Sequence, residues 1–232
     1  MVSEQLARWY DTIFSEKDYA GEVDAIRAIY REHTGIDGPD DVFDLGCGTG
    51  SHALEFERDG CEVWADDNDP AMLAVAKAKI LRVGVPPDYV DMTVSLFHVT
   101  NYCLTIEKLA GLFTRAHIYL RPGGLFVFDT WDVLLARDDP PMPHRYKHIV
   151  GDLGGLRETL PIQYPDDDTV RVVNHTTIER RGDPQAEVFD WEYTHRLWTP
   201  AIIRDCLDMA GFSSSEPPRK WGKRSVIYVA VK

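Results

Sequence analysis

The sequence lacks the features that would place it in a membrane, on nucleic acid or in an oxidising compartment. No apolar run approaches 18 residues, so we expect no membrane-spanning segment. Basic residues are the minority, 25 Lys and Arg against 38 Asp and Glu, and the net charge of -13 argues against nucleic-acid and anionic-membrane partners. The cysteines show no Cys-x-x-Cys spacing, and no secretory signal is evident, so we expect reduced thiols and a cytoplasmic location.

Length and composition fit one domain of enzyme size. The chain has 232 residues, of which 44% are hydrophobic and 11% aromatic, enough to bury a full core. A negative net charge remains compatible with a small phosphorylated partner, because such a ligand needs only a local basic pocket. We expect a small-molecule substrate and no metal, and the sequence is compatible with a homodimer.

The most informative segment is a glycine-rich turn at residues 42–51. An apolar strand carries Asp44 at its end, and Gly46, Gly48 and Gly50 follow at alternate positions. Glycine tolerates positive φ and lets a ligand lie against the backbone. Dinucleotide-binding turns read Gly-x-Gly-x-x-Gly and face a pyrophosphate, whereas a carboxylate this close favours a ligand with a cationic amino-acid group. The alternative is a surface turn without a ligand.

A second carboxylate follows the next predicted strand. The stretch from Glu62 reads as a strand, and Asp69 followed by Pro70 predicts the start of a helix. In open parallel sheets, an acid about 20 residues after the glycine turn can bind a ribose hydroxyl pair. Asp67 has that position, although a run of acids also forms solvated turns.

The rest of the chain divides into an α/β part and an inserted β part. Helices are predicted at 23–33, 51–58 and 106–120, and strands at 89–97 and 125–129, which favours a doubly wound, mostly parallel sheet. Alternation at 170–180 and 187–198 predicts antiparallel strands, followed by a helix at 200–211 and a strand at 226–231. We therefore expect a core with an N-terminal lid (1–130), an antiparallel β flap over the substrate cleft (131–198) and a C-terminal helix and strand completing the core sheet (199–232).

Together these segments resemble the class I S-adenosylmethionine (SAM) methyltransferases. The resemblance rests on Asp-x-Gly-x-Gly-x-Gly at 44–50, the acid and Pro-x-Met-Leu at 67–73, and Leu-x-Pro-Gly-Gly-x-x-x-x-Asp at 120–129. It implies a Rossmann-like α/β fold and SAM as cofactor, with Asp44 near the methionine end and Asp67 on the ribose. The cofactor-binding residues that it implies are Tyr10, Tyr19, Asp44, Gly46, Cys47, Gly48, Gly50, Asp67, Asn68, Met72 and Phe97.

More narrowly, nearly the whole chain resembles the N-methyltransferases of nucleotide-linked deoxyaminosugars. The segments that carry this resemblance are 9–14, 17–19, 95–102, 192–196 and 198–200. It implies that the acceptor is the amino group of a nucleotide-linked sugar. Between Met72 and Asp91, however, the chain lacks the family's strand ending in Gly-Asp, whose acid contacts adenine. Either backbone and apolar contacts hold adenine, or the sheet is remodelled, or SAM binds weakly.

Three side chains are candidates for catalysis: Tyr102, His98 and His195. A methyltransferase mainly aligns a nucleophile with the C–S bond and excludes water, and an amine acceptor must lose its proton. Tyr102 matches the family position that faces the acceptor, and a phenol pKa of about 10 favours orientation over base catalysis. His98 and His195 are candidate bases, with packing in the sheet as the alternative for each.

A basic loop before the last strand is a candidate for binding a nucleotide diphosphate. Residues 217–224 contain four cations around one tryptophan. We expect Arg219 or Arg224 to pair with phosphate and Trp221 to stack on a base or sugar; the alternative is a solvated hairpin.

Other functions remain open at this stage. The first is O-methylation of a sugar or glycan precursor, and the second is SAM binding without methyl transfer. An NAD-dependent dehydrogenase is the third.

Overall fold

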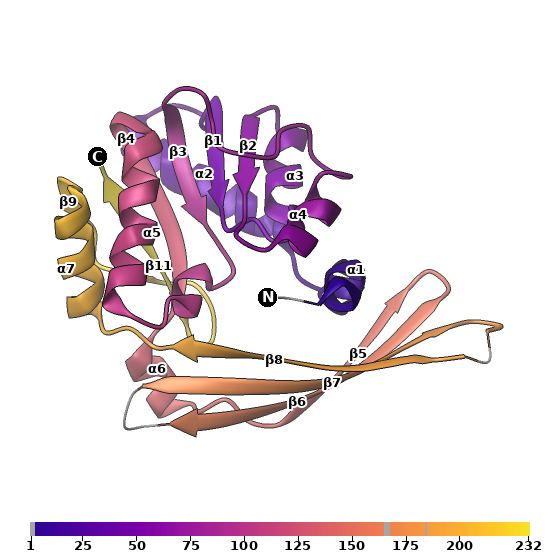
Figure 1. The fold of residues 1–232 in the computed structure, drawn as a ribbon. Coiled ribbons are helices and arrows are strands. Elements are labelled where there is room, and N and C mark those ends of the chain that lie inside the picture. Colours follow the sequence, from indigo (N-terminus) through magenta and orange to yellow (C-terminus); the bar gives the residue numbers. More distant parts are fainter. Residues whose placement is uncertain (1–2, 165–167, 184) are drawn as a thin grey trace.

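The computed structural model describes residues 3–164, 168–183 and 185–232 and contains two β-sheets (Figure 1). The first sheet has the order β10-β11-β4-β3-β1-β2, with β9 beside β11. Its parallel part is β1 (Asp41–Leu45), β2 (Glu62–Asp66), β3 (Val90–Ser95) and β4 (Leu120–Trp131). Its antiparallel part is β9 (Ser214–Ser215), β10 (Arg219–Lys220) and β11 (Ser225–Val231).

Helices cover both faces of this core sheet, as the predicted doubly wound fold requires. Val42 and Val94 pack in one buried cluster with side chains of α2 (Tyr19–Thr34) and α3 (Ser51–Arg58). Phe43 and Phe126 pack in another with side chains of α5 (Ile106–Tyr119) and α7 (Pro200–Ala210). The central strands are buried on both faces, so adjacent positions such as Val42 and Phe43 are both apolar.

Two parts of the core sheet need comparison with the sequence analysis. The expected turn at 121–124 lies within β4, because the backbones of Gly123 and Gly124 hydrogen-bond to Lys232 at the end of the chain. Beyond β2 the missing Gly-Asp strand leaves one parallel bridge, between Ala65 and Val83. The Ala65 N–H donates to the Arg82 carbonyl at 3.1 Å, and its carbonyl accepts from the Gly84 N–H at 2.8 Å. The sheet is therefore remodelled at this edge.

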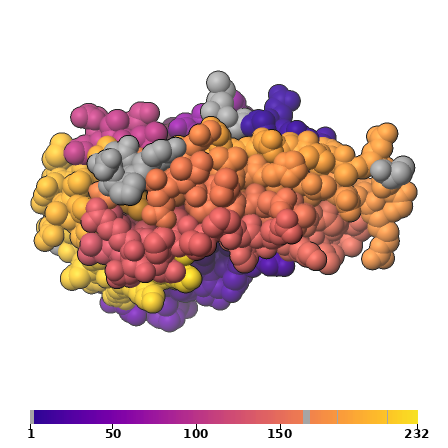
Figure 2. Space-filling view, turned by 90° about the horizontal axis from the view of Figure 1, so that it is seen from below, coloured from indigo at the N-terminus to yellow at the C-terminus, as the bar shows by residue number. Residues whose placement is uncertain are grey.

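The second sheet is the flap, inserted between β4 and β11. It is fully antiparallel and consists of β5 (His144–Val150), β6 (Leu153–Tyr164), β7 (Thr169–Arg180) and β8 (Glu187–Arg196). The sequence analysis missed β5 and β6, because Gly154, Gly155 and Pro161 disfavour a strand. Figure 2 shows the flap spread across one face of the molecule.

Four further helical segments complete the fold in the part of the chain that the structure describes. They are α1 (Glu4–Ile13), α4 (Pro70–Ala76), the 3-10 turn η1 (Val99–Tyr102) and α6 (Val133–Asp138), which connects the core sheet to the flap. Asp69 caps α4 as predicted, accepting from the backbone of Ala71 at 3.0 Å. In Figure 1, α1 lies between the core sheet and the flap. Over the described ranges, no helix combines the length and apolarity needed to span a bilayer.

Candidate active site

The glycine turn follows β1 and adopts the left-handed backbone that its sequence predicts. The φ angles of Gly46, Gly48 and Gly50 are 88°, 56° and 80°. A Cβ on Gly46 would lie 2.6 Å from Cγ1 of Val99, so no side chain fits there. At Gly48 a Cβ would meet no atom within 4 Å, so the turn is open on that side. This leaves room for a ligand directly against the backbone.

Asp67 joins the glycine turn to the end of β2. Its carboxylate accepts the Gly48 N–H and the Asp69 N–H, each at 2.8 Å. Two carboxylate oxygens offer about four lone-pair positions, so two remain for a ribose hydroxyl pair. Burial raises the pKa of this carboxyl, opposed by those two backbone hydrogen bonds.

Asp44 is a buried acid that lacks a cation. It is 2% exposed and forms no ion pair with a basic side chain in the described residues. Burial raises its pKa to about 6, the nearby charge of His52 opposes the shift, and Asp67 adds to it. A ligand with a positive charge would compensate the ionised form. Asp44 and the open face of Gly48 therefore fit the ammonium and sulfonium groups of SAM.

Helix α1 is tied to the glycine turn by Asp11, which the sequence analysis did not single out. Its carboxylate accepts from the Thr49 hydroxyl at 2.6 Å, from Ser51 at 3.3 Å and from Lys79 Nζ at 2.7 Å. This network fixes α1 next to the glycine turn.

The other predicted cofactor residues surround the same region. Tyr10 and Phe97 both line the large cavity described below, whereas Tyr19 packs edge-on against His52 with ring centroids 4.8 Å apart. Burial raises the pKa values of Tyr10 and Tyr19. Three further predicted cofactor residues follow β1 and β2. Cys47 is half-buried, Asn68 is exposed and Met72 is buried.

His98 leaves β3 through an unusual backbone. Phe97 and His98 have φ angles of 66° and 65°, a left-handed conformation that costs non-glycine residues roughly 1–2 kcal/mol each. The Asp129 carboxylate holds the strained segment by accepting the His98 N–H at 3.0 Å. The conformation directs the imidazole to the end of β4 and the start of β11.

The imidazole of His98 is held by two buried partners. Its Nε2 lies 2.8 Å from the hydroxyl of Ser225 and 3.2 Å from the carboxylate of Asp129. Burial lowers the pKa of His98, and the charge of Asp129 opposes that shift. The ring is therefore neutral at neutral pH and can accept a proton. The sequence analysis did not assign a role to Asp129. The feature that could have indicated one is its position at the end of the Leu-x-Pro-Gly-Gly-x-x-x-x-Asp motif.

A cavity of about 690 Å³ lies between the flap, α1 and the core, a suitable size for a small molecule. His98 and Tyr102 line it from the core, and Tyr193 lines it from the flap. Desolvation raises the pKa of the Tyr102 hydroxyl, so Tyr102 can orient a ligand but is not a base near neutral pH.

His195 does not line this cavity. It is 3% exposed and packs against the rings of Tyr102 and Tyr193, with both centroids at 4.6 Å. Neither ring nitrogen has a hydrogen-bond partner in the part of the chain that the structure describes. Burial, followed by the nearby charge of His98, lowers its pKa well below 6.5. His195 lies behind Tyr102, outside the cavity. This position agrees with a packing role for His195 and not with a role as the catalytic base.

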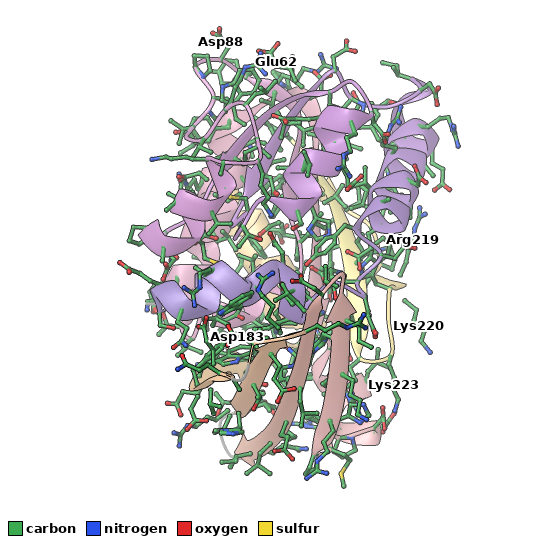
Figure 3. The ribbon with its side chains drawn as sticks, turned by 90° about the vertical axis from the view of Figure 1, so that its right-hand side faces the viewer. Glu62, Asp88, Asp183, Arg219, Lys220 and Lys223 are labelled. Carbon is green, nitrogen blue, oxygen red and sulfur yellow. The ribbon has the colours of Figure 1, made fainter. Side chains whose placement is uncertain are left out.

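The basic loop is divided between two places. The Arg219 guanidinium donates to Glu32 at 2.7 Å and Glu216 at 2.9 Å, and Figure 3 shows it on the outer edge beside Lys220. Trp221 packs against the core, and neither residue lines the cavity. Arg224 does line it, although its Nη2 donates to the Pro140 carbonyl at 3.0 Å. Arg219 is kept away from the expected acceptor site by its two carboxylate partners, and Trp221 by its packing against the core.

Comparison with known protein families finds a match for the segment of the chain that contains the glycine turn. Residues 42–124 match the family described as a methyltransferase domain. The match covers less than half of the chain. The matched segment contains the glycine turn, Asp67 and His98, and the predicted resemblance to the SAM-dependent methyltransferases is confirmed.

Relatives extend the likeness beyond the matched segment. A dTDP-3-amino-3,4,6-trideoxy-α-D-glucopyranose N,N-dimethyltransferase of Streptomyces venezuelae is 28% identical over 126 residues, covering 50% of this chain and 52% of that protein. The chain spans about half the length of the curated relatives it matches.

Solved structures match the whole fold. Streptomyces venezuelae DesVI has a TM-score of 0.85 at 19% identity, covering 100% of this chain and 99% of that one. SAM-bound CalS10, an amino pentose methyltransferase from Micromonospora echinaspora, has a TM-score of 0.77 at 17% identity, covering 100% and 97%. The predicted Rossmann-like fold with its antiparallel flap is confirmed.

Proposed function

We propose that this protein is a SAM-dependent methyltransferase that acts on the amino group of a nucleotide-linked deoxyaminosugar. The observation that carries the proposal is the imidazole of His98, which lines the cavity beside the glycine turn and lies 2.8 Å from Ser225 and 3.2 Å from the Asp129 carboxylate. The likeness to an amino-sugar N,N-dimethyltransferase and to an amino pentose methyltransferase supports this acceptor class.

The residues of this chain account for the steps that an amine acceptor requires. SAM, when bound, supplies an activated methyl group. Asp44 compensates the positive charge of the cofactor, and Asp67 accepts from its ribose hydroxyls. With its Nε2–H directed to Ser225 and 3.2 Å from the Asp129 carboxylate, His98 has Nδ1 to take the proton that the acceptor nitrogen loses. Asp129 then stabilises the imidazolium.

The flap and α1 provide the enclosure. Aromatic side chains from both surround the acceptor space; among them Tyr10 and Phe14 come from the α1 region and Trp191 and Tyr193 from β8. They limit the access of water and orient the acceptor, which are the main contributions of a protein to methyl transfer. Tyr102 contributes a hydroxyl donor at the core side of this space.

The test measures methyl transfer from SAM to dTDP- and UDP-linked amino sugars, with the product identified by mass spectrometry. His98→Ala should lower kcat by about 10²–10⁴-fold, the usual contribution of a positioned base, and leave the Kd for SAM unchanged. The matched control is His175→Ala, on the outer part of the flap where His175 pairs with Asp190, and it should retain full activity.

Three results would contradict the proposal. SAM binding without turnover on any amino sugar would indicate a binding protein, methylation of a hydroxyl would indicate an O-methyltransferase, and an unchanged kcat in His98→Ala would remove the base.

A further inference from the structure

Three buried polar side chains of the flap line the cavity, and each has at least one nitrogen without a hydrogen-bond partner in the described residues. His148, Arg157 and Asn174 are 3%, 8% and 1% exposed, and all three line the cavity. Both ring nitrogens of His148, Nε of Arg157 and Nδ2 of Asn174 lack hydrogen bonds within the described residues. Burying such groups unpaired is costly, so a missing partner is expected in the cavity.

Strand register brings the three side chains to one face. Arg157 of β6 lies opposite Tyr146 of β5, and His148 is two residues further along β5. Asn174 of β7 lies opposite Thr159, two residues after Arg157. Residues two apart on a strand share a face, and directly opposed residues are neighbours, so the side chains converge from three adjacent strands.

Arg157 differs from the other cations of the cavity. Lys17 pairs with Glu22, and Lys223 and Arg224 both pair with Asp139. The Arg157 guanidinium has no carboxylate partner in the described ranges and lies between the rings of Phe14 and Tyr146, at 4.6 and 4.4 Å from their centroids. A buried charge of this kind calls for an opposite charge.

The free groups are mainly donors. An arginine offers five N–H groups and no acceptor, and a neutral histidine offers one N–H. The Oδ1 of Asn174 already accepts from the Thr159 hydroxyl at 2.8 Å, so its free Nδ2 is a donor as well. Converging donors around a cation match an oxyanion.

We infer that Arg157, His148 and Asn174 bind an oxyanion carried by the acceptor, either a phosphate or a carboxylate. Phe14, which covers Arg157, contacts Phe97 with centroids 5.1 Å apart, and Phe97 precedes His98. One acceptor can therefore reach both the anion site and the base. The inference rests on the proposed function, since it specifies the acceptor of that same cavity.

Calorimetry tests the site with three probes: inorganic phosphate, dTDP and glucuronate, each with and without S-adenosylhomocysteine. The wild type should bind at least one of them, and Arg157→Met should weaken that binding at least about tenfold, the loss of one charge-assisted contact. The Kd for S-adenosylhomocysteine should stay within about twofold. Arg145→Met is the matched control, because Arg145 lies on the exposed side of the same strand pair, bound to Glu158 at 2.6 Å.

A second variant guards against misfolding of Arg157→Met. Asn174→Asp keeps the size of the side chain and the acceptor for Thr159, but replaces the free donor with a negative charge, and it should also weaken anion binding. Binding of phosphate or dTDP alone would identify a phosphate group, and binding of glucuronate alone a carboxylate; both support the site.

The inference is overturned if the wild type binds none of the probes, or if both flap variants bind them as tightly as the wild type. Binding of S-adenosylhomocysteine without any anion would sink this inference and leave the proposed function intact. Anion binding without S-adenosylhomocysteine binding would do the reverse.

Discussion

The carboxyl edge of the core sheet and the inner face of the flap meet at one cavity but are built by different means. At the core edge, the conformation of the backbone determines the shape of the site. The glycine turn has three positive φ angles, and Phe97 and His98 have one each. On the flap, regular strands present side chains such as Arg157 through their register. Backbone sites tolerate few substitutions, whereas register sites depend on the chemistry of single side chains.

The two regions also differ in charge. The core edge contributes the carboxylates Asp44, Asp67 and Asp129, while the flap contributes Arg157, a cation without a carboxylate partner in the described residues. The carboxylates of the core edge suit a positively charged cofactor, and Arg157, which lines the cavity, suits a negatively charged acceptor.

The largest effect is expected from a side chain added to the core turn. Gly46→Ala places a Cβ 2.6 Å from Val99 at a φ of 88°, so the turn must shift and the affinity for SAM should fall by more than about 100-fold. Gly60→Ala has a similar φ of 92° but meets no atom within 4 Å, so it should cost about 1–2 kcal/mol of stability and leave SAM affinity unchanged. Equal affinities in the two variants would show that backbone closeness does not matter at this turn.

The next effect concerns a side chain of the core edge. Asp67→Ala removes the acceptor for two backbone N–H groups and for the ribose, and a lost contact of roughly 1.5–3 kcal/mol corresponds to about a tenfold to hundredfold weaker Kd for SAM. Asp66→Ala is the control, because the neighbouring carboxylate pairs with Arg115 instead. Calorimetry measures the Kd for SAM of both variants. An unchanged Kd in Asp67→Ala would show that this residue does not bind the cofactor.

The difference between the regions also explains what the sequence could predict. The core edge depends on local signals: alternating glycines, an acid at a strand end and a Pro after a capping Asp. These predicted β1, β2, α3 and α4 and brought Asp67 to the turn. Asp129 could also have been predicted as a site residue, because it ends the Leu-x-Pro-Gly-Gly-x-x-x-x-Asp motif. Its contact with His98, however, depends on the strained backbone at Phe97.

The flap offered no such signals. Its β5 and β6 were missed, and with them His148 and Arg157, because glycines and a proline obscure the alternation of β6. Even with correct strands, the meeting of Arg157 with Phe14 depends on long-range docking of α1. The clustered cations of the basic loop were a misleading signal, since Arg219 is satisfied by Glu32 and Glu216 outside the cavity.

A pH profile tests the role of the buried Asp44 carboxyl. The pKa of Asp44, about 6 in the folded protein, exceeds its ordinary value of 3.8, so the fold favours the protonated form. Its contribution to stability is full below about pH 4 and is lost as the pH rises through 6, by at most about 3 kcal/mol.

A bound cation favours the ionised carboxylate, so SAM affinity should rise about tenfold between pH 5 and pH 7. Asp44→Asn should flatten most of that rise, leaving the smaller share of Asp67, whose pKa is also raised. Calorimetric Kd values across this range provide the measurement, and a wild-type profile without slope would contradict the assignment of Asp44.

The smallest effect is expected at the basic loop, where the acceptor could extend past the flap. Arg224 lines the cavity but is already engaged by Asp139 and Pro140, so Arg224→Ala should raise the KM for a dTDP-linked amino sugar by only about two- to fivefold, as for an interaction worth less than about 1 kcal/mol. Arg219→Ala should leave that KM unchanged, because its guanidinium pairs with acids on the outer edge. Steady-state kinetics at saturating SAM measures both. An increase in KM with Arg219→Ala as large as that with Arg224→Ala would mean that the acceptor reaches the edge strand β10, and the flap would then no longer be the main wall that recognises its charge.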